Sequence, residues 1–502
     1  MTKLVTVTIF NEIDCVIDGL DPEHQKFFSD SYSPFAASYR FNPKFKLGIW
    51  DGKIRFYTTG GNTFVYLLEE ILPSVKKLGY KIKINDHRTS DAYLQPEHVK
   101  ADRFAHICDP DSGEPFIFRD YQLRVINNLI DNGSGIGLAA TSAGKTFITA
   151  GLIDAYEQVG GTSIVIVPSV DLVKQTLREL RQWGLDCGEY SGDIKDLDHP
   201  HIVSTWQALQ NKPEIISSRS LCLIDECHGV KANVLKQIIA KCGKDIPHRM
   251  GITGTLPKDP CDKMTIRTML GNIVAEVGAK ELIDRGYLAT LDITRYQMVE
   301  DLKSQYETYV EDQKVMGDAI MPYDAFKKSY FPDYKAEKAF VSKNKRRMRA
   351  IADLIIQRSA FGNVFALVDN VDFGKGVTAM IPGAVFLYGK NATEERQAVY
   401  EEFKKRDDMI VIANSKIAST GLSIKRINEL FLIDLGKSFV KIIQSIGRGL
   451  RKATDKQHVN VHDVGTDLKY GHAHALERGR HYKEAEYPST KTKVDYSHIA
   501  QL

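Results

Sequence analysis

A short loop at residues 139–146, with the sequence AATSAGKT, has the residue types of a phosphate-binding turn. An apolar, strand-like run precedes it and a helix-compatible stretch follows it. In such a turn the backbone N–H groups surround phosphates, the lysine reaches the terminal phosphates and the threonine hydroxyl holds magnesium. Ala139 departs from the pattern, which asks for glycine at that position. The loop predicts a nucleotide site centred on Lys145 and Thr146.

Two adjacent carboxylates, Asp225 and Glu226, end an apolar run about 80 residues after this loop. Hydrolysis of a nucleoside triphosphate needs one carboxylate to complete magnesium coordination and a second to orient and deprotonate water. We therefore assign magnesium to Asp225 together with Thr146, and the water to Glu226. A metal site made of Cys222, Cys227 and His228 is the weaker alternative, because buried strand cysteines explain that spacing.

Alternating strands and helices must position these residues, and such alternation predicts a parallel sheet with crossover helices. Ligands of these sheets bind at the carboxyl ends of the strands, where the polar residues of this chain fall. In the first half we expect strands at 135–138, 164–168, 202–207, 221–228 and 250–255, and helices from Arg119 and over 169–183. A second series follows at 364–368, 384–388, 409–413 and 430–434, with a helix over 439–450.

Composition limits the class of protein. At 502 residues the chain is expected to form about three domains, and a net charge of +3 says nothing about an acidic partner. The seven cysteines are scattered and favour neither a disulfide framework nor a zinc module. Without a signal segment or a long apolar run, we expect a soluble cytoplasmic protein with no membrane contact.

The first 112 residues are predicted to form a separate α+β domain, with strands at 4–10 and 80–84 and a helix over 64–77. Within it, residues 39–57 interleave five cations with aromatic residues around an Asp51-Gly52 hairpin signal. Cations hold phosphates and aromatic faces stack on bases. We expect nucleic-acid contacts here; a hairpin with one buried aromatic side is the alternative. The contact residues would be Lys44, Lys46, Lys53 and Arg55.

Residues 296–345 are polar and are predicted to form a helical connector or insert. The basic run at 343–349 is either a solvated helix face or a nucleic-acid contact. Residues past 466 are predicted to form a closing helix and a tail.

The ordered motifs resemble those of superfamily 2 helicases over about residues 115 to 465, and within them the phage branch-remodelling helicases. Arg119 and Gln122 resemble the adenine-reading element. The remaining matches are Ser142-Ala143-Gly144-Lys145-Thr146, Ile166-Val167-Pro168-Ser169, Ser204-Thr205-Trp206-Gln207, Asp225-Glu226-Cys227-His228, Thr253-Gly254-Thr255, Ser419-Thr420-Gly421-Leu422-Ser423 and Gln444-x-x-Gly447-Arg448-x-x-Arg451.

The resemblance implies an α/β fold with two RecA-like parallel-sheet lobes beside a small α+β N-terminal domain. Its domains would be 1–112, lobe one at 113–295, the insert at 296–345 and lobe two at 346–502. ATP and Mg²⁺ are the implied cofactors. Nucleotide-binding residues would include Gln444, and catalytic ones Arg448 and Arg451, whose guanidinium groups neutralise transition-state charge. Strand contacts would come from Ser169, Thr205 and Thr420, and coupling from His228, Thr253 and Thr255.

The function so implied is an ATP-dependent DNA helicase or translocase acting on forks, four-way junctions or R-loops in recombination, replication or repair. DNA would be its partner, with recombination or replication proteins beside it; we expect a monomer, in the bacterial host cytoplasm if phage-encoded. A duplex translocase or RNA helicase is one alternative. Because of Ala139, a nucleic-acid-binding scaffold with an inactive nucleotide site is another.

Overall fold

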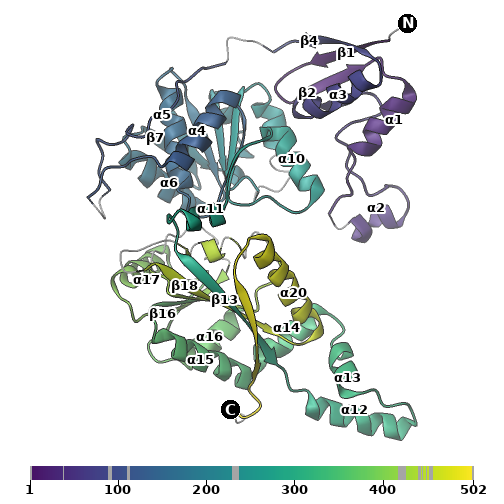
Figure 1. The fold of residues 1–502 in the computed structure, drawn as a ribbon, viewed down its shortest axis with the longest axis vertical. Coiled ribbons are helices and arrows are strands. Elements are labelled where there is room, and N and C mark those ends of the chain that lie inside the picture. Colours follow the sequence, from purple (N-terminus) through teal and green to yellow (C-terminus); the bar gives the residue numbers. More distant parts are fainter. Residues whose placement is uncertain are drawn as a thin grey trace. The chain divides into compact units, whose positions relative to one another are not determined.

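Two compact units, Met1–Gly278 and Ala279–Leu502, make up the chain. The ribbon of Figure 1 shows the elements of both. The computed structural model describes residues 3–37, 39–88, 93–109, 113–228, 237–415, 426–438, 443, 445–447, 449–450 and 456–499. None of the described helices combines the length and the apolar character needed to cross a membrane.

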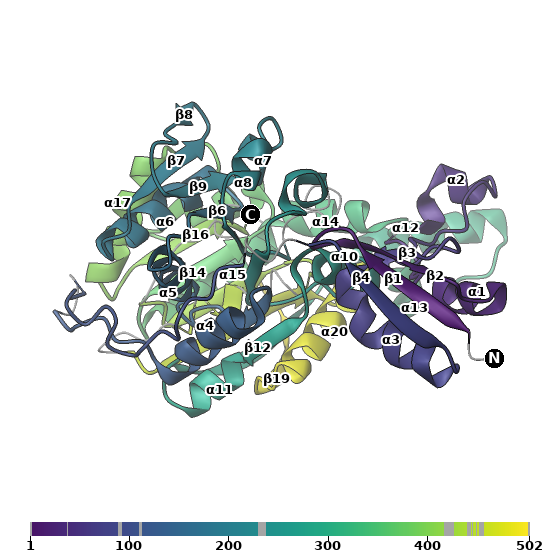
Figure 2. The same cartoon turned by 90° about the horizontal axis from the view of Figure 1, so that it is seen from above.

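A small four-stranded sheet opens the first unit, with the order β3-β2-β1-β4. Strand β1 pairs antiparallel with β2 and parallel with β4. Helix α3 lies beside this sheet (Figure 2) and buries Ile71 and Val75 in its core. The elements are β1 (Leu4–Ile9), β2 (Asp14–Asp18), α1 (Pro22–Ser31), a 3₁₀ turn (Tyr39–Phe41), α2 (Pro43–Lys46), β3 (Asn62–Phe64), a second 3₁₀ turn (Val65–Leu67), α3 (Leu68–Lys77) and β4 (Lys81–Asp86).

The predicted hairpin at Asp51-Gly52 is wrong. The chain before it forms a short helix, α2. Asn42 caps the first turn of this helix by accepting from the backbone N–H of Lys44, and Pro43 occupies the first helical position. Lys53 pairs in an isolated antiparallel bridge with Phe35 and not with the residues just before Asp51. The Asp51 carboxylate accepts from the backbone N–H of Lys53 and pairs with Arg55. We call residues 39–55 the arm; α2 stands away from the four-stranded sheet (Figure 1).

An eight-stranded sheet follows in the first unit, with the order β12-β5-β11-β10-β6-β9-β7-β8. All its pairs are parallel except β7 with β8. Its strands are β5 (Gly135–Ala139), β6 (Ser163–Val167), β7 (Cys187–Ser191), β8 (Ile194–Lys195), β9 (His201–Thr205), β10 (Leu221–Asp225), β11 (His248–Thr253) and β12 (Ile273–Val277). Its helices are α4 (Asp120–Asn132), α5 (Lys145–Glu157), α6 (Val170–Gln182), α7 (Trp206–Leu209), α8 (Glu214–Ser217), a π-turn (Ile239–Gly243) and α10 (Pro260–Leu270).

Helix α7 corrects the predicted strand over 202–207. Strand β9 stops at Thr205, because the Thr205 hydroxyl accepts from the backbone N–H of Ala208 and starts a helix at Trp206.

A buried arginine joins the two sheets of the first unit. The Arg249 side chain is fully buried on β11, and its Nη2 atom donates to the carbonyl of Glu12 at 3.0 Å and the hydroxyl of Tyr66 at 3.1 Å. Its Nε atom donates to the carbonyl of Met269 at 3.0 Å. Ile13 of the N-terminal domain also packs into the core of the eight-stranded sheet. The N-terminal domain is thereby built onto the first lobe.

The second unit contains a seven-stranded, all-parallel sheet with the order β15-β16-β14-β17-β18-β13-β19. Its strands are β13 (Thr290–Val299), β14 (Val364–Val368), β15 (Val385–Leu387), β16 (Ile410–Asn414), β17 (Glu429–Ile433), β18 (His458–Thr466) and β19 (Ser489–Asp495). Its helices are α11 (Ala279–Asp284), α12 (Lys303–Met316), α13 (Tyr323–Ser329), α14 (Tyr334–Lys343), α15 (Lys345–Ser359), α16 (Val371–Ala379), α17 (Thr393–Lys405) and α20 (Lys469–Glu484).

These sheets confirm the α/β class with two parallel-sheet lobes and a small N-terminal α+β domain. The insert is helical from Lys303 onward, but residues 296–299 complete β13, which lies between β18 and β19. The division between the units accordingly falls at Gly278, earlier than the expected end of lobe one at 295. The predicted tail also contains a strand, β19, that pairs with β13.

Candidate nucleotide site

The predicted phosphate loop connects β5 to α5 at the carboxyl edge of the eight-stranded sheet. Gly144 has a left-handed backbone, with φ of +83°, and caps the amino end of α5. A Cβ atom on Gly144 would lie 2.4 Å from Nε2 of Gln122, so both backbone and space require glycine here. Lys145 and Thr146 are then the first two residues of the helix, where backbone N–H groups face an anion.

Gln122 holds this loop in place. Its Oε1 atom accepts from the backbone N–H of Arg119 at 2.9 Å, and its Nε2 atom donates to the carbonyl of Ala143 at 3.0 Å. The hydroxyl of Tyr121 donates to the same carbonyl at 3.1 Å. Gln122 is therefore a buried anchor of the loop; its expected reading of adenine, with Arg119, stays a prediction.

The backbone at position 139 does not require glycine. Ala139 is the last residue of β5, pairs with Val277 of β12 and has no left-handed backbone angle. Its methyl group is fully buried. The departure from the loop pattern is thus accommodated by ordinary strand geometry.

Lys145 and Glu226 are paired with each other in this structure. Lys145 Nζ lies 2.9 Å from Oε1 of Glu226, and both side chains are largely buried. The second oxygen of Glu226 accepts from the Thr253 hydroxyl at 3.2 Å and lies 3.3 Å from Nδ1 of His228. Burial by itself raises the pKa of Glu226, but the charge of Lys145 and the His228 hydrogen bond outweigh it and hold that pKa below its usual range. Glu226 is accordingly ionised and oriented.

The residues predicted to have a coupling role form one cluster around the Thr253 hydroxyl. His228 Nδ1 lies 2.6 Å from Thr253 Oγ1, and Thr255 contributes its backbone N–H at 3.4 Å and its carbonyl at 3.0 Å. Since a hydroxyl has a single hydrogen, it can donate either to Glu226 or to the carbonyl of Thr255. Thr253 is thus able to change partners when Glu226 moves.

Asp225 ends β10 beside this cluster. Burial, followed by the charge of Glu226, raises the pKa of Asp225 to about 7. A cation at this carboxylate would relieve that cost. The described residues hold no cluster of three or more His, Cys, Asp or Glu side chains that could bind a metal. Magnesium takes one or two protein ligands together with substrate phosphates and water, and its assignment to Asp225 and Thr146 stays a prediction.

Gly254 brings the Thr253–Thr255 turn against the phosphate loop. A Cβ atom on Gly254 would lie 3.1 Å from the backbone nitrogen of Thr141 and 3.4 Å from the carbonyl oxygen of Ala139. Thr141 Oγ1 and Thr255 Oγ1 are buried without a hydrogen-bond partner among the described residues. Sequence reasoning missed this close approach; the glycine between two threonines was the available signal.

The residues expected to contact a nucleic-acid strand in the first lobe are helix caps. The Ser169 hydroxyl accepts from the backbone N–H of Leu172 at the start of α6, and Thr205 caps α7. Ser169 is half-buried and Thr205 is buried. Their strand-contacting role stays a prediction.

The arm keeps its predicted contact residues near the surface. Lys44 and Lys46 are exposed on α2. Arg55 pairs with Asp51 at 2.5 Å, and Lys53 Nζ lies 5.4 Å from the ring centre of Phe35. The predictions for Thr420, Gln444, Arg448 and Arg451 lie outside the described residues.

The basic run at 343–349 includes a residue that belongs neither to a solvated helix face nor to a nucleic-acid contact. Arg347 is fully buried at the start of α15, where its Nε atom lies 2.9 Å from Glu300 and its Nη2 atom donates to Asp434 at 2.8 Å. It therefore supports the second sheet. The sequence signal near Arg347 is Asn344, whose side chain caps the first turn of α15.

Comparison with known proteins places this site in a family. Three family models match in chain order: "DNA helicase UvsW, N-terminal" over residues 20–85, "Type III restriction enzyme, res subunit" over 115–258 and "Helicase conserved C-terminal domain" over 348–453. The ATP-dependent DNA helicase UvsW of Enterobacteria phage T4 is 25% identical over 93% of this chain and 95% of its own length. The chain belongs to the superfamily 2 helicases.

Other similarities of the helicase are partial. The DNA 3′-5′ helicase XPB of Mycobacterium tuberculosis is 23% identical over 62% of this chain and 53% of its own length. The Type ISP restriction-modification enzyme LlaBIII, solved bound to DNA, shares the fold with a TM-score of 0.53 at 14% identity, over 85% of this chain and 34% of that chain. As a member of this family, the helicase is an ATP-hydrolysing enzyme.

Proposed function

We propose that the helicase uses ATP hydrolysis to unwind or branch-migrate branched DNA, such as forks and four-way junctions. The nucleotide site supports the ATP-driven part. Lys145 would take the terminal phosphates, Asp225 and Thr146 would hold magnesium, and Glu226 would orient water. Arg448 and Arg451 would neutralise charge on the transferred phosphoryl group.

The observation that carries the branched-DNA part is the surface of the arm. Phe41 is 79% exposed, and Leu47 and Ile49 are each 72% exposed, beside the exposed cations Lys44 and Lys46. Exposed apolar side chains of this size are costly in water unless they meet a partner. Apolar wedges that part stacked bases, next to cations that hold phosphates, are a known way to engage distorted DNA.

The relatives' names agree with this proposal, since UvsW of phage T4 is named as a DNA helicase and its N-terminal family model covers the arm. Recombination, replication or repair would be the setting, in the cytoplasm of the host cell. Ala139 no longer motivates an inactive scaffold, because strand geometry accommodates it.

Point variants of the arm test the proposal better than a truncation does. Removing the N-terminal domain would strip Ile13 from the core of the first lobe and the partners of Arg249. In the full chain, the double variant Phe41→Ala/Ile49→Ala should weaken binding to a four-way junction by about tenfold while single-stranded DNA still stimulates ATPase activity. Ile84→Ala is the matched control, an exposed apolar residue of the same domain on β4.

Equal loss of affinity for junction, fork and single strand would contradict the role given to the arm. A parallel ATPase measurement with DNA and RNA of the same sequence separates DNA from RNA as the activating polymer. Stimulation by RNA alone would overturn the proposed substrate.

A further inference from the structure

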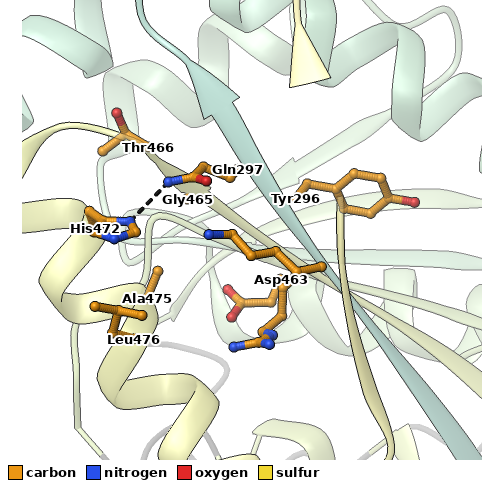
Figure 3. Close-up of a pocket in the computed structure, with 10 residues that line it drawn as sticks. Tyr296, Gln297, Asp463, Gly465, Thr466, His472, Ala475 and Leu476 are labelled. Atoms are coloured by element: carbon orange, nitrogen blue, oxygen red, sulfur yellow. Dashed lines mark hydrogen bonds between the residues drawn. The ribbon is translucent and has the colours of Figure 1, made fainter. Parts of the chain in front are cut away.

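A small hollow in the second unit lies under α20, at the strands β13, β18 and β19. Figure 3 shows its lining, including Gln297 of β13, Asp463 and Gly465 of β18, and His472 of α20. Its cavity volume is about 30 Å³, which accommodates roughly two water molecules. That space suits one small polar group and is too small for a nucleoside.

Strand register gathers cations on the face of the sheet that lines this hollow. Arg295 of β13 pairs with Asp463 of β18 on one side and with Lys491 of β19 on the other. Two residues further on, Gln297 pairs with Gly465 and with Lys493. Side chains two residues apart share a face of a strand. Arg295, Lys491 and Lys493 therefore form a line of positive charge along the sheet edge, which we call the basic row.

The single acidic side chain that lines the hollow is already paired. Asp463 accepts from the Nε atom of Arg478 at 2.9 Å and from the hydroxyl of Tyr482 at 2.9 Å, and both of these side chains are buried. Its charge is therefore neutralised within the fold and does not offset the basic row.

Arg295 has an unmet hydrogen-bonding group. Its Nε atom is buried and has no hydrogen-bond partner among the described residues. Gly479 makes room for the guanidinium, since a Cβ atom there would lie 2.2 Å from Nη1 of Arg295. A buried N–H of a charged group without a partner is costly, and like charges on directly opposed strand positions add to that cost. An anion in the hollow would remove both costs.

Gln297 and His472 also line the hollow. Nε2 of Gln297 lies 2.9 Å from Nδ1 of His472 (Figure 3). Burial and then the charge of Lys491 hold the pKa of His472 below its usual value, in keeping with a positive potential there. A lysine on an edge strand can serve only to prevent strand pairing, but that role does not explain the buried Nε atom of Arg295.

We propose that the hollow at Arg295, with the basic row, binds a backbone phosphate of nucleic acid. The inference rests on the proposed function, because it assumes that the helicase binds DNA. A line of cations along an exposed strand suits a polymer of phosphates better than one free ion. Arginine can donate two parallel hydrogen bonds to a phosphate, while Lys491 and Lys493 act as point charges.

Salt-dependent binding of the full-length protein tests this site. Labelled single-stranded and forked DNA would be titrated with wild type, Arg295→Gln, Lys491→Gln and the control Arg406→Gln, whose side chain is exposed and paired with Glu402 and Asp408 on the surface. Both test variants should bind roughly tenfold more weakly, with the slope of log affinity against log salt about one unit shallower. The control should keep the wild-type slope.

Each alternative result is decisive. Wild-type binding with unchanged slopes in both test variants overturns the site and leaves the proposed function standing. A wild type that binds no DNA overturns both. Melting temperatures in inorganic phosphate and in chloride at equal ionic strength form the second arm. If phosphate stabilises wild type but not Arg295→Gln, and the DNA slopes are unchanged, the hollow binds free phosphate and the nucleic-acid assignment is wrong. Lys491 is exposed, so its variant keeps the test valid should Arg295→Gln fold poorly.

Discussion

Lys145, predicted to reach the terminal phosphates, and Glu226, predicted to orient water, are joined by a 2.9 Å ion pair. In the proposed mechanism, a terminal phosphate would take the lysine and separate the pair, which would free Glu226 to turn toward water. The Thr253 hydroxyl, already within reach of Glu226 and Thr255, is placed to follow that change.

Glu226→Gln should uncouple binding from hydrolysis. The amide has the same size but no charge, so Lys145 is released to the phosphates while the proton acceptor is lost. We expect ATP affinity at least equal to wild type and turnover reduced by about 10²- to 10⁴-fold. Nucleotide titration and single-turnover ATPase assays measure the two separately. Glu276→Gln, an exposed glutamate on β12, is the control; near-normal turnover in Glu226→Gln would remove Glu226 from the mechanism.

Asp225→Asn should show a pH-dependent gain in stability. The pKa of Asp225 is raised to about 7, so the native state favours the protonated form. The stability from that proton is complete below the unfolded pKa, near 4, and is lost as pH rises through 7. Asparagine cannot ionise. Without nucleotide, we expect the variant to be more stable than wild type by about 1–2 kcal/mol at pH 8, allowing for partial exposure, and to lose this advantage toward pH 5.

Denaturant unfolding at pH 5 and pH 8 measures the effect. The same variant should lose ATP hydrolysis, because the proposed magnesium ligand is gone. An equal stability difference at both pH values would show that Asp225 does not titrate in this range.

Gln122 variants should separate loop anchoring from adenine reading. Gln122→Ala removes both bonds of the amide, to Arg119 and to Ala143, so the KM for nucleotide should rise by about tenfold or more. If Gln122 only anchors the loop, ATP and GTP suffer equally; if it reads adenine, the preference for ATP over GTP falls as well. Gln158→Ala, at the exposed end of α5, is the control. An unchanged KM would contradict both roles.

Arg249→Met should loosen the N-terminal domain from the first lobe. The change leaves the carbonyls of Glu12 and Met269 buried without their donor, so we expect a loss of about 3 kcal/mol or more. Arg267→Gln is the comparison, because its partly exposed guanidinium pairs with Glu70 at 2.6 Å and donates to Asn272 and the carbonyl of Tyr66, and we expect a smaller loss there. Apparent melting temperature and protease sensitivity of the N-terminal domain measure the two. Equal effects would mean that burial of Arg249 contributes no more than a surface pair.

The placement of the candidate nucleotide-site residues was predictable because its determinants are local. The loop at 139–146 and the carboxylates after β10 each combine a short motif with an apolar strand beside it. Their meeting follows from the rule that parallel strands present their carboxyl ends at one edge. Roles that depend on contacts with a nucleic-acid strand or with the second lobe stay predictions.

Strands β13 and β19 were missed for a physical reason. Strand β19 has the sequence STKTKVD, with mostly exposed side chains, and its pairing partner β13 lies almost 200 residues earlier. No apolar periodicity marks a strand whose pairing comes from such a distant segment. Buried arginines such as Arg249 and Arg347 are equally invisible in sequence, since arginine is seldom fully buried without partners that only the fold supplies.

The buried contacts of Arg249 attach the N-terminal domain firmly to the first lobe, so a movement of the lobe can be transmitted to that domain. Arg249 and Thr253 lie on one strand, β11. This strand therefore connects the domain that carries the arm with the turn beside the phosphate loop. A domain joined to the lobe only by a flexible linker could bind DNA but could not transmit a movement of the lobe to it. In the proposed function, a displacement of the first lobe would be transmitted through β11 and the N-terminal domain to the DNA bound at the arm.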